Sequence, residues 1–374
     1  MRIDTVATTH FRNLADASVS LAEGVNLFVG DNGQGKTNLL EAIYLFKFGR
    51  SFRAGRETEM IRFGEGFCRA EASCTFRDGH RETFALSIER DGSKKPRISG
   101  CDLARLSELV GRFPVVLFGP EDLRLVSGQP AERRRFLDMV GSMTSRAYLE
   151  LVRDYRRVLI QRGAALKAHA ASRELVVWNA ELVNKGCALT LARRTLAGAI
   201  SEHLQARAVE VGLRGGFSLE YESEILQEAG LVARDGGEIE GEPMREVFHA
   251  KLNALERVEM RRGITLAGPH RDDLLVRIGE ADVRRFGSQG QRRLLAVLLK
   301  LAELSYLESE LSEPCVLLLD DVFSEFDREI SGRLHGTLEG VRQVLITSPI
   351  PIEWAASGRI RAFTVSNGVV FCRQ

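Results

Sequence analysis

Residues 30–37 read Gly-Asp-Asn-Gly-Gln-Gly-Lys-Thr, a spacing of residue types that could bind phosphate groups. Glycines let backbone N–H groups turn toward phosphate oxygens, and the N-terminus of a following helix adds a favourable dipole. In this pattern we expect Lys36 to reach the β- and γ-phosphates of a nucleoside triphosphate, and the Thr37 hydroxyl to bind Mg²⁺. The alternative is a chance glycine-rich turn, which the preceding apolar run at residues 25–29 disfavours because the pattern requires a strand there.

A carboxylate for the metal is expected at the end of a neighbouring buried strand. Residues 315–321, Cys-Val-Leu-Leu-Leu-Asp-Asp, have this character. Asp320 would hold the metal directly or through water, and Asp321 would orient the attacking water or accept its proton. Considered alone, two aspartates after a strand could cap a helix. Together with the glycine-rich motif, they predict a site that hydrolyses a magnesium nucleotide.

A second candidate phosphate site lies at residues 287–291, Gly-Ser-Gln-Gly-Gln, before an apolar helix. The Ser288 hydroxyl and the Gly290 N–H could donate to a phosphate from the helix N-terminus. Ser288 and Gln291 could instead form a capping box, which stabilises a helix by about 1 kcal/mol. The two interpretations are compatible, and the residues alone leave both open.

The elements that must position these residues indicate an α/β protein. Short strands are expected on either side of a turn at residues 10–13, and residues 62–98 have the alternation of antiparallel hairpins. Stretches rich in Ala, Leu, Arg and Glu predict helices from about residue 120 to 210. The strand and helix pattern returns at residue 264 and ends in a hairpin at residues 362–371.

The composition excludes several classes of protein. Lys and Arg number 52 against 51 Asp and Glu, so the net charge of +1 gives no overall attraction to nucleic acid or lipid. No apolar run reaches the roughly 18 to 20 residues of a membrane span. The six cysteines include no C-x-x-C pair. We therefore expect a cytoplasmic protein with reduced thiols and no membrane partner, whose DNA contacts would need local basic patches.

The chain resembles the RecF family in five separated blocks that span nearly its whole length. Ser288-Gln289-Gly290-Gln291 also looks like the ABC signature, and it lies much further from Lys36 than in a transporter cassette, as in SMC-like ATPases. A transporter cassette would also have a histidine where this chain has Thr347. The five blocks are residues 11–13, 33–43, 118–123, 268–273 and 287–291.

The resemblance implies an ABC-type, SMC-like P-loop ATPase lobe of α/β fold, with an inserted and mainly helical second lobe. The ATPase lobe would comprise residues 1–120 and 264–374, and the inserted lobe residues 121–263. RecF proteins bind ATP and Mg²⁺, hydrolyse ATP weakly with stimulation by DNA, and form ATP-dependent homodimers. In DNA replication and recombinational repair, and in the SOS response to DNA damage, they help to load RecA, together with RecR and RecO, at gaps or junctions between single- and double-stranded DNA. An SMC-like ATP-gated DNA clamp or scaffold with little hydrolysis is the alternative, although the insertion is too short for a long coiled-coil arm.

The resemblance also implies roles for particular residues. Asp321 and Lys36 would act in catalysis together with Ser288 of a second chain. Asp327, in a D-loop, would lie at the dimer interface, and Thr347 at the switch position predicts slow hydrolysis. The metal ligands would be Thr37 and Asp320. The nucleotide-binding residues would be Gly30, Asn32, Gly33, Gly35, Lys36, Thr37, Asn38, Arg12, Asn13, Ser288, Gly290, Gln291, Asp327 and Thr347.

Three groups of arginines are candidate contacts for DNA phosphates, and no aromatic residues interleave them to suggest base stacking. A solvated or ion-paired surface is the alternative for each group. No role is assigned to Glu121 and Asp122, and the block around His270 could be a structural turn. The candidate groups are residues 133–135, residues 261–262, and Arg153, Arg156 and Arg157 on a basic helical face that also includes Arg146 and Arg162.

Overall fold

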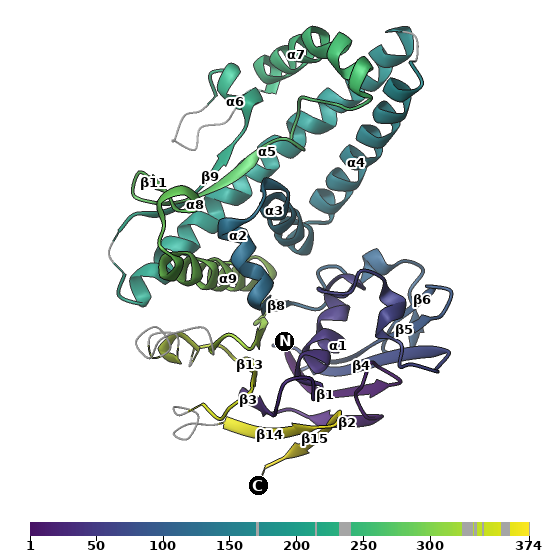
Figure 1. Ribbon diagram of the computed structural model, residues 1–374, viewed down its shortest axis with the longest axis vertical. Helices are drawn as coiled ribbons and strands as arrows, with labels where there is room; N and C mark the ends of the chain where they lie inside the picture. The colour runs from purple at the N-terminus through teal and green to yellow at the C-terminus, as the bar shows by residue number, and fades with distance from the viewer. Residues whose placement is uncertain are drawn as a thin grey trace. The chain divides into compact units, whose positions relative to one another are not determined.

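The chain divides into two compact units, and each is described by itself. The computed structural model describes residues 1–169, 172–213, 215–231, 241–323, 332, 335–338, 340–352 and 360–373. The first unit comprises Met1–Leu123, Arg207–Leu213 and Ala296–Gln374, and the second Arg124–Ala206 and Arg214–Leu295 (Figure 1). Residues 264–295 therefore cluster with the second unit, whereas the sequence placed them in the ATPase lobe.

An antiparallel sheet of six strands forms part of the first unit, in the order β2-β1-β4-β5-β6-β7. Its hairpin between β4 and β5 turns at Gly79, whose φ of 89° lies in the left-handed region that favours glycine. This confirms the hairpins expected at residues 62–98. The strands are β1 (Arg2–Thr9), β2 (Ala17–Ser20), β4 (Phe67–Thr75), β5 (Arg81–Glu89), β6 (Lys94–Ile98) and β7 (Cys101–Asp102).

The second sheet of this unit also has six strands, in the order β15-β14-β3-β13-β12-β8. All neighbours are parallel except β14 and β15. Every residue of β12 and β13 is buried, which explains the apolar runs at residues 316–319 and 344–346. The strands are β3 (Gly24–Val29), β8 (Val115–Phe118), β12 (Val316–Asp320), β13 (Gln343–Ser348), β14 (Ile360–Ser366) and β15 (Val369–Cys372).

Helix α1 (Lys36–Phe48) packs against strands of both sheets, namely β4 and β5 of the first and β8, β12 and β13 of the second. Its residues from Leu39 to Lys47 are all buried, as expected of a helix that is apolar on nearly every side. Short 3₁₀ turns lie in the connecting segments, namely η1 (Glu57–Met60) before β4, η2 (Leu106–Glu108) before β8 and η3 (Pro120–Leu123) after β8.

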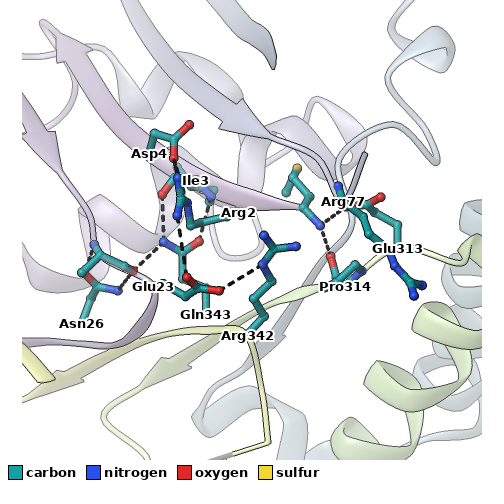
Figure 2. Close-up of polar contacts among 12 residues, drawn as sticks. Arg2, Ile3, Asp4, Glu23, Asn26, Arg77, Glu313, Pro314, Arg342 and Gln343 are labelled. Atoms are coloured by element: carbon teal, nitrogen blue, oxygen red, sulfur yellow. Dashed lines mark hydrogen bonds and ion pairs between the residues drawn. The ribbon is translucent and has the colours of Figure 1, made fainter. Parts of the chain in front are cut away.

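Buried amide side chains link the two sheets near the first strand (Figure 2). The Gln343 amide accepts from Ile3 N at 2.7 Å and donates to Ile3 O at 2.8 Å. The Asn26 amide likewise accepts from Ala22 N and donates to Ala22 O, both at 2.8 Å. An amide has both a donor and an acceptor, so each of these side chains satisfies backbone groups that would otherwise be buried without partners.

The second unit is mainly helical, as the sequence predicts. It also contains a three-stranded antiparallel sheet, β11-β10-β9, made of β9 (Phe217–Glu222), β10 (Asp273–Ile278) and β11 (Ala281–Asp282). None of the helices in the described part of the chain is long and apolar enough to cross a membrane. The helices are α2 (Arg124–Ser127), α3 (Pro130–Thr144), α4 (Arg146–Lys167), α5 (Ser172–Glu210), α6 (Glu224–Glu228), α7 (Gly241–Arg262), α8 (Val283–Phe286) and α9 (Gln289–Leu311), the last residues of α5 and most of α9 belonging to the first unit.

Candidate nucleotide-binding site

The glycine-rich loop joins the carboxyl end of β3 to the N-terminus of α1, as its motif requires. Gly33 and Gly35 have φ angles of 79° and 115°, which residues with side chains adopt only under strain. A Cβ atom on Gly30 would lie 2.1 Å from the Val365 carbonyl oxygen of β14. The loop therefore needs glycine at these positions, both for its backbone conformation and for its packing on the sheet.

The Lys36 side chain is buried and folds back over this loop. Its Nζ donates to Gly30 O at 2.5 Å and to Asp31 O at 2.8 Å. Burial lowers the pKa of Lys36, and the nearby carboxylates of Asp321 and Asp320 oppose that shift. The ammonium group is thus held inside the loop whose backbone N–H groups are suited to phosphate binding.

Two threonine hydroxyl groups and one carboxylate meet at the ends of β12 and β13. Thr37 Oγ1 and Thr347 Oγ1 each donate to Asp320 Oδ1 at 2.8 Å. Burial raises the pKa of Asp320, and the hydrogen bonds from Thr347 and Thr37 partly offset that effect. A threonine hydroxyl and a carboxylate are oxygen ligands of the type that Mg²⁺ prefers, so these residues fit the expected metal site.

Asp321 follows directly and has a φ of 51°, an unusual left-handed backbone for a residue with a side chain. Its N–H donates to Thr347 Oγ1 at 3.0 Å. Backbone strain of this kind costs on the order of 1–3 kcal/mol and is concentrated at functional sites. The Thr347 hydroxyl, expected to contact nucleotide, donates to the Asp320 carboxylate and accepts from the Asp321 N–H, and thereby holds both residues in place.

A hydrogen-bonded chain extends from the loop to α1 and the segment before it. Asn13 Nδ2 donates to Gly33 O at 2.9 Å, and Asn38 Nδ2 donates to Asn13 Oδ1 at 2.5 Å. Arg12 pairs with Glu41 of α1 through two hydrogen bonds, one of them 2.8 Å long. Arg12 and Asn13 thus lie beside the loop, as expected, but the Arg12 guanidinium is bound to a carboxylate of the protein itself.

Sequence reasoning missed Glu41 and Arg53 as members of this group. Glu41 is fully buried and also accepts from Arg53 at 2.9 Å and from Ser51 Oγ at 2.5 Å. Arg53 in addition donates to Asn38 Oδ1. A carboxylate inside the apolar sequence Leu-Leu-Glu-Ala-Ile-Tyr was the available signal, because a buried charge requires partners from elsewhere in the chain.

Replacing Glu41 by glutamine is expected to lower the free energy of unfolding by about 2–3 kcal/mol near pH 7, because two arginines lose their charged acceptor. Burial alone would raise the pKa of Glu41, but hydrogen bonds from Arg12, Arg53 and Ser51 outweigh it and lower the pKa. The stabilisation is therefore present above the unfolded-state pKa of about 4.3, and is lost as the pH falls through the lower folded-state value.

Urea unfolding of the wild-type and Glu41→Gln chains, from pH 7 to about pH 3, measures this difference. The half-exposed Glu89, paired with Lys95 on the surface, provides the control variant Glu89→Gln, which should change stability by less than about 1 kcal/mol. A difference between wild type and Glu41→Gln that stays constant across the pH range would refute this explanation.

The signature-like residues lie at the start of α9, in the second unit. Ser288 N donates to Gln291 Oε1 at 2.8 Å, and Gln291 N donates to Ser288 Oγ at 3.2 Å. This reciprocal pair is the predicted capping box. Ser288, Gly290 and Gln291 are all exposed, so the capping role leaves this helix N-terminus accessible. The predicted D-loop, with Asp327, lies outside the described residues.

The arginine groups separate into buried and exposed members. Arg133 is buried and donates to both carboxylate oxygens of Asp273, at 2.7 and 2.9 Å, and Arg134 donates to Asp272 O at 2.5 Å. Arg162 is buried against Glu259. The expectation that Arg133 could contact DNA is wrong, because its buried guanidinium is bound by Asp273. Arg134 is half-buried. Arg135, Arg146, Arg153, Arg156, Arg157, Arg261 and Arg262 are exposed.

The block around His270 is a structural turn within the second unit. Tyr155 Oη lies 2.6 Å from His270 Nδ1, and His270 Nε2 lies 3.1 Å from Thr265 O. Burial lowers the pKa of His270 to about 4, so the imidazole is neutral near pH 7. The next residue but one, Asp272, accepts from Tyr221 Oη at 2.7 Å.

Comparison with known proteins places this arrangement in a family. Residues 2–353 match the family described as RecF/RecN/SMC N terminal domain. The DNA replication and repair protein RecF of Macrococcus caseolyticus is 36% identical over 99% of both chains, and that of Halothermothrix orenii is 37% identical over 99% of this chain and 98% of its own.

Solved structures agree with this relationship. The chain superposes on the recombination mediator protein RecF with ATP with a TM-score of 0.89 and 29% identity, covering 100% of this chain and 97% of the other. An SMC head bound to the C-terminal winged-helix domain of ScpA gives a TM-score of 0.57 at 14% identity, over 99% of this chain and 96% of the other, a likeness of fold alone.

The fold and the site define a P-loop ATPase head of the ABC-type, SMC-like class, which confirms the predicted fold class. Within that class, the chain belongs to the RecF family.

Proposed function

We propose that this chain is an ATP-dependent DNA-binding protein of recombinational repair and replication, with an ATPase site that is completed by a second copy of the chain. The main supporting observation is that Thr37 and Thr347 each donate a 2.8 Å hydrogen bond to Asp320, next to Lys36. Phosphate-binding, metal-binding and water-orienting groups thereby lie together around one glycine-rich loop.

In the proposed mechanism, Lys36 and the loop N–H groups hold the β- and γ-phosphates. Thr37 and Asp320 would hold Mg²⁺, which would neutralise phosphate charge. Asp321, fixed by its strained backbone and by Thr347, orients the attacking water. Gly30, Asn32, Gly33, Gly35 and Asn38 complete the nucleotide contacts, with Arg12 and Asn13 beside the loop.

The second copy is needed because the exposed N-terminus of α9 carries phosphate donors that its own capping box does not cover. Ser288 and Gly290 of one chain would approach the γ-phosphate held by Lys36 of the other, and Gln291 would keep the helix start rigid. Asp327 would lie at the same interface. An aspartate rather than a glutamate at position 321, with no switch histidine at Thr347, supports slow hydrolysis. Its stimulation by DNA is proposed from the family.

The proposed substrates and partners follow from the family. The relatives are named as DNA replication and repair proteins, and the ATP-bound relative as a recombination mediator in the RecFOR pathway. We therefore propose that ATP-bound dimers act at gaps or junctions in DNA and help to load RecA together with RecR and RecO. The expected location is the cytoplasm.

The Asp321→Asn variant tests the composite site, because it should bind ATP and hydrolyse it at least tenfold more slowly. Its mass by sedimentation is expected to rise from the 41.6 kDa of one chain to twice that value with Mg-ATP, and to stay at one chain without nucleotide. Bound ATP with an unchanged mass would instead indicate a monomeric P-loop enzyme. Dimerisation without measurable hydrolysis in the wild type would favour the ATP-gated clamp.

The exposed face of Arg153, Arg156 and Arg157 on α4 is the best remaining candidate for DNA contact. Arg156 and Arg157 pair with Asp138 and Asp154, yet their side chains are 62% and 71% exposed. Replacing all three by alanine should lower DNA affinity about tenfold or more at low salt and flatten its salt dependence, since each lost phosphate contact reduces the slope by about 0.9.

DNA binding across a salt series measures this effect. A control variant replaces two exposed arginines of the first unit that also pair with carboxylates, Arg97 of β6 and Arg112, which lies between η2 and β8. Equal losses in both variants would indicate a general effect of charge, and unchanged binding in the α4 variant would remove that face as the DNA site.

A further inference from the structure

Four charged side chains meet in the interior of the first unit, and we call them the buried charge cluster. Lys47 Nζ donates to Glu303 Oε1 at 2.9 Å, and both side chains are 1% exposed. Lys300 contacts the other oxygen of Glu303 and lies 3.7 Å from Asp122 Oδ1. Two lysines thus face two carboxylates, and the cluster is neutral when all four groups are ionised.

The cluster joins the two helices whose N-termini bear the phosphate-binding motifs. Lys47 lies on α1 about three turns, or about 16 Å, after Lys36. Lys300 and Glu303 lie on α9 about three to four turns after Ser288. The ion pair between Lys47 and Glu303 is therefore a direct contact between the bodies of these two helices.

The cluster also reaches the strand end beside the metal-binding position. Asp122 Oδ2 accepts from Gly119 N at 2.9 Å. Gly119 follows β8 and lies close to Asp320, because a Cβ added to it would be 3.6 Å from Asp320 Cβ. The segment 119–122, to which the sequence assigned no role, thus links α9 with the surroundings of Asp320.

Stability alone gives a weak reason for burying these charges. Removing an ion pair from water costs much of what the pairing returns, and apolar side chains of similar volume often replace such pairs without loss of stability. Burial would raise the pKa of Glu303, but the charges of Lys300 and Lys47 outweigh it and keep the carboxylate ionised. Buried ion pairs do impose a particular alignment, since sliding or rotating either helix would leave a charge without its partner.

We propose that the buried charge cluster fixes the register between the P-loop helix α1 and the signature-bearing helix α9, and so sets where Ser288 stands when two ATP-bound chains meet. Lys47 and Glu303 are positioning residues in this scheme and touch no nucleotide. The inference rests on the proposed function, because it supplies the alignment that a composite ATP site requires. An apolar contact of equal area would allow neighbouring registers, and Ser288 would then be held less accurately.

The test is a double variant, Lys47→Met with Glu303→Met, which leaves Lys300 paired with Asp122 and keeps the net charge unchanged. Four quantities are measured: the unfolding midpoint, ATP affinity, the fraction of dimer with Mg-ATP, and the rate of ATP hydrolysis. We expect the first two to stay near wild-type values, while dimerisation and hydrolysis fall at least tenfold.

The controls separate this inference from the function on which it rests. The exposed pair of Lys95 and Glu89, replaced by methionines in the same way, should behave as wild type throughout. If the methionine variant of the cluster dimerises and hydrolyses as wild type does, the cluster has no positioning role. If that variant does not fold, Lys47→Met with Glu303→Gln, which also keeps the net charge unchanged and leaves an amide oxygen beside Lys300, is judged by the same criteria. If wild type itself neither dimerises nor hydrolyses ATP, the proposed function fails and this inference falls with it.

Discussion

Replacing Lys36 by methionine is expected to weaken ATP binding by about 10- to 100-fold. The ammonium group forms charge-assisted hydrogen bonds with phosphate oxygens, and the loss of such bonds costs roughly 1.5–3 kcal/mol, with each 1.4 kcal/mol equal to a factor of ten. Methionine has a similar length and replaces the charge without opening a large space. Titration with a fluorescent ATP analogue measures the affinity directly.

The fold should tolerate this change, because Lys36 makes its two hydrogen bonds with carbonyl groups of the loop itself. Burial of the Lys36 side chain lowers its pKa, which shows that the charged form is desolvated. Removal of the charge therefore relieves a desolvation cost. Lys95→Met, at a site where the lysine side chain is 64% exposed, is the matched control and should bind ATP as wild type does. Wild-type affinity in Lys36→Met would show that the nucleotide lies elsewhere.

Ser288→Arg is expected to abolish ATP-dependent dimerisation, with the mass remaining at 41.6 kDa in the presence of Mg-ATP, while the affinity for ATP stays close to wild type. Ser288 is the N-cap residue, directly before the first residue of α9. A bulky side chain there prevents this helix N-terminus from approaching the γ-phosphate that the partner chain binds. ATP affinity and dimerisation should therefore separate in this variant, whereas both should fall in Lys36→Met. Sedimentation with a nonhydrolysable ATP analogue provides the measurement.

A pair of alanine variants distinguishes the proposed contact from helix capping. Ser145 caps α4 by accepting a hydrogen bond from Tyr148 N, as Ser288 caps α9. Ser145→Ala and Ser288→Ala should each lower the free energy of unfolding by about 1 kcal/mol. Only Ser288→Ala should reduce dimerisation and hydrolysis. Equal activity in the two variants would mean that Ser288 acts as a cap alone.

Features that depend on neighbouring residues could be predicted from the sequence. The spacing of Gly30, Gly33, Gly35 and Lys36 specified a turn between a strand and a helix, because the backbone angles and the free N–H groups of that turn depend on local residue types. The same holds for the capping box at Ser288 and for the hairpins of the antiparallel sheet. The buried strand before Asp320 was evident for a similar reason, since a run of apolar residues requires burial on both faces.

Features that depend on distant partners were not accessible in this way. The sequence placed Arg133 and Arg134 among candidate DNA contacts, whereas Arg133 binds the Asp273 carboxylate and Arg134 binds the Asp272 carbonyl inside the second unit. Strand β9 pairs with β10, although α6 and α7 separate the two strands in the chain. Residues 264–295 therefore belong to the second unit, whereas the sequence assigned them to the ATPase lobe. The sequences of β9 and β10 contain no local feature that identifies the strand with which each one pairs.

The sequence by itself determined the phosphate-binding loop, the aspartates after the buried strand and the helix start at Ser288, because each is encoded by residues adjacent in the chain. Only the tertiary structure decided which charges meet: Glu41 with Arg12 and Arg53, and Lys47 with Glu303. The reason is physical, since a buried charge must find a partner, but the choice of that partner depends on how α1 packs against the rest of the unit.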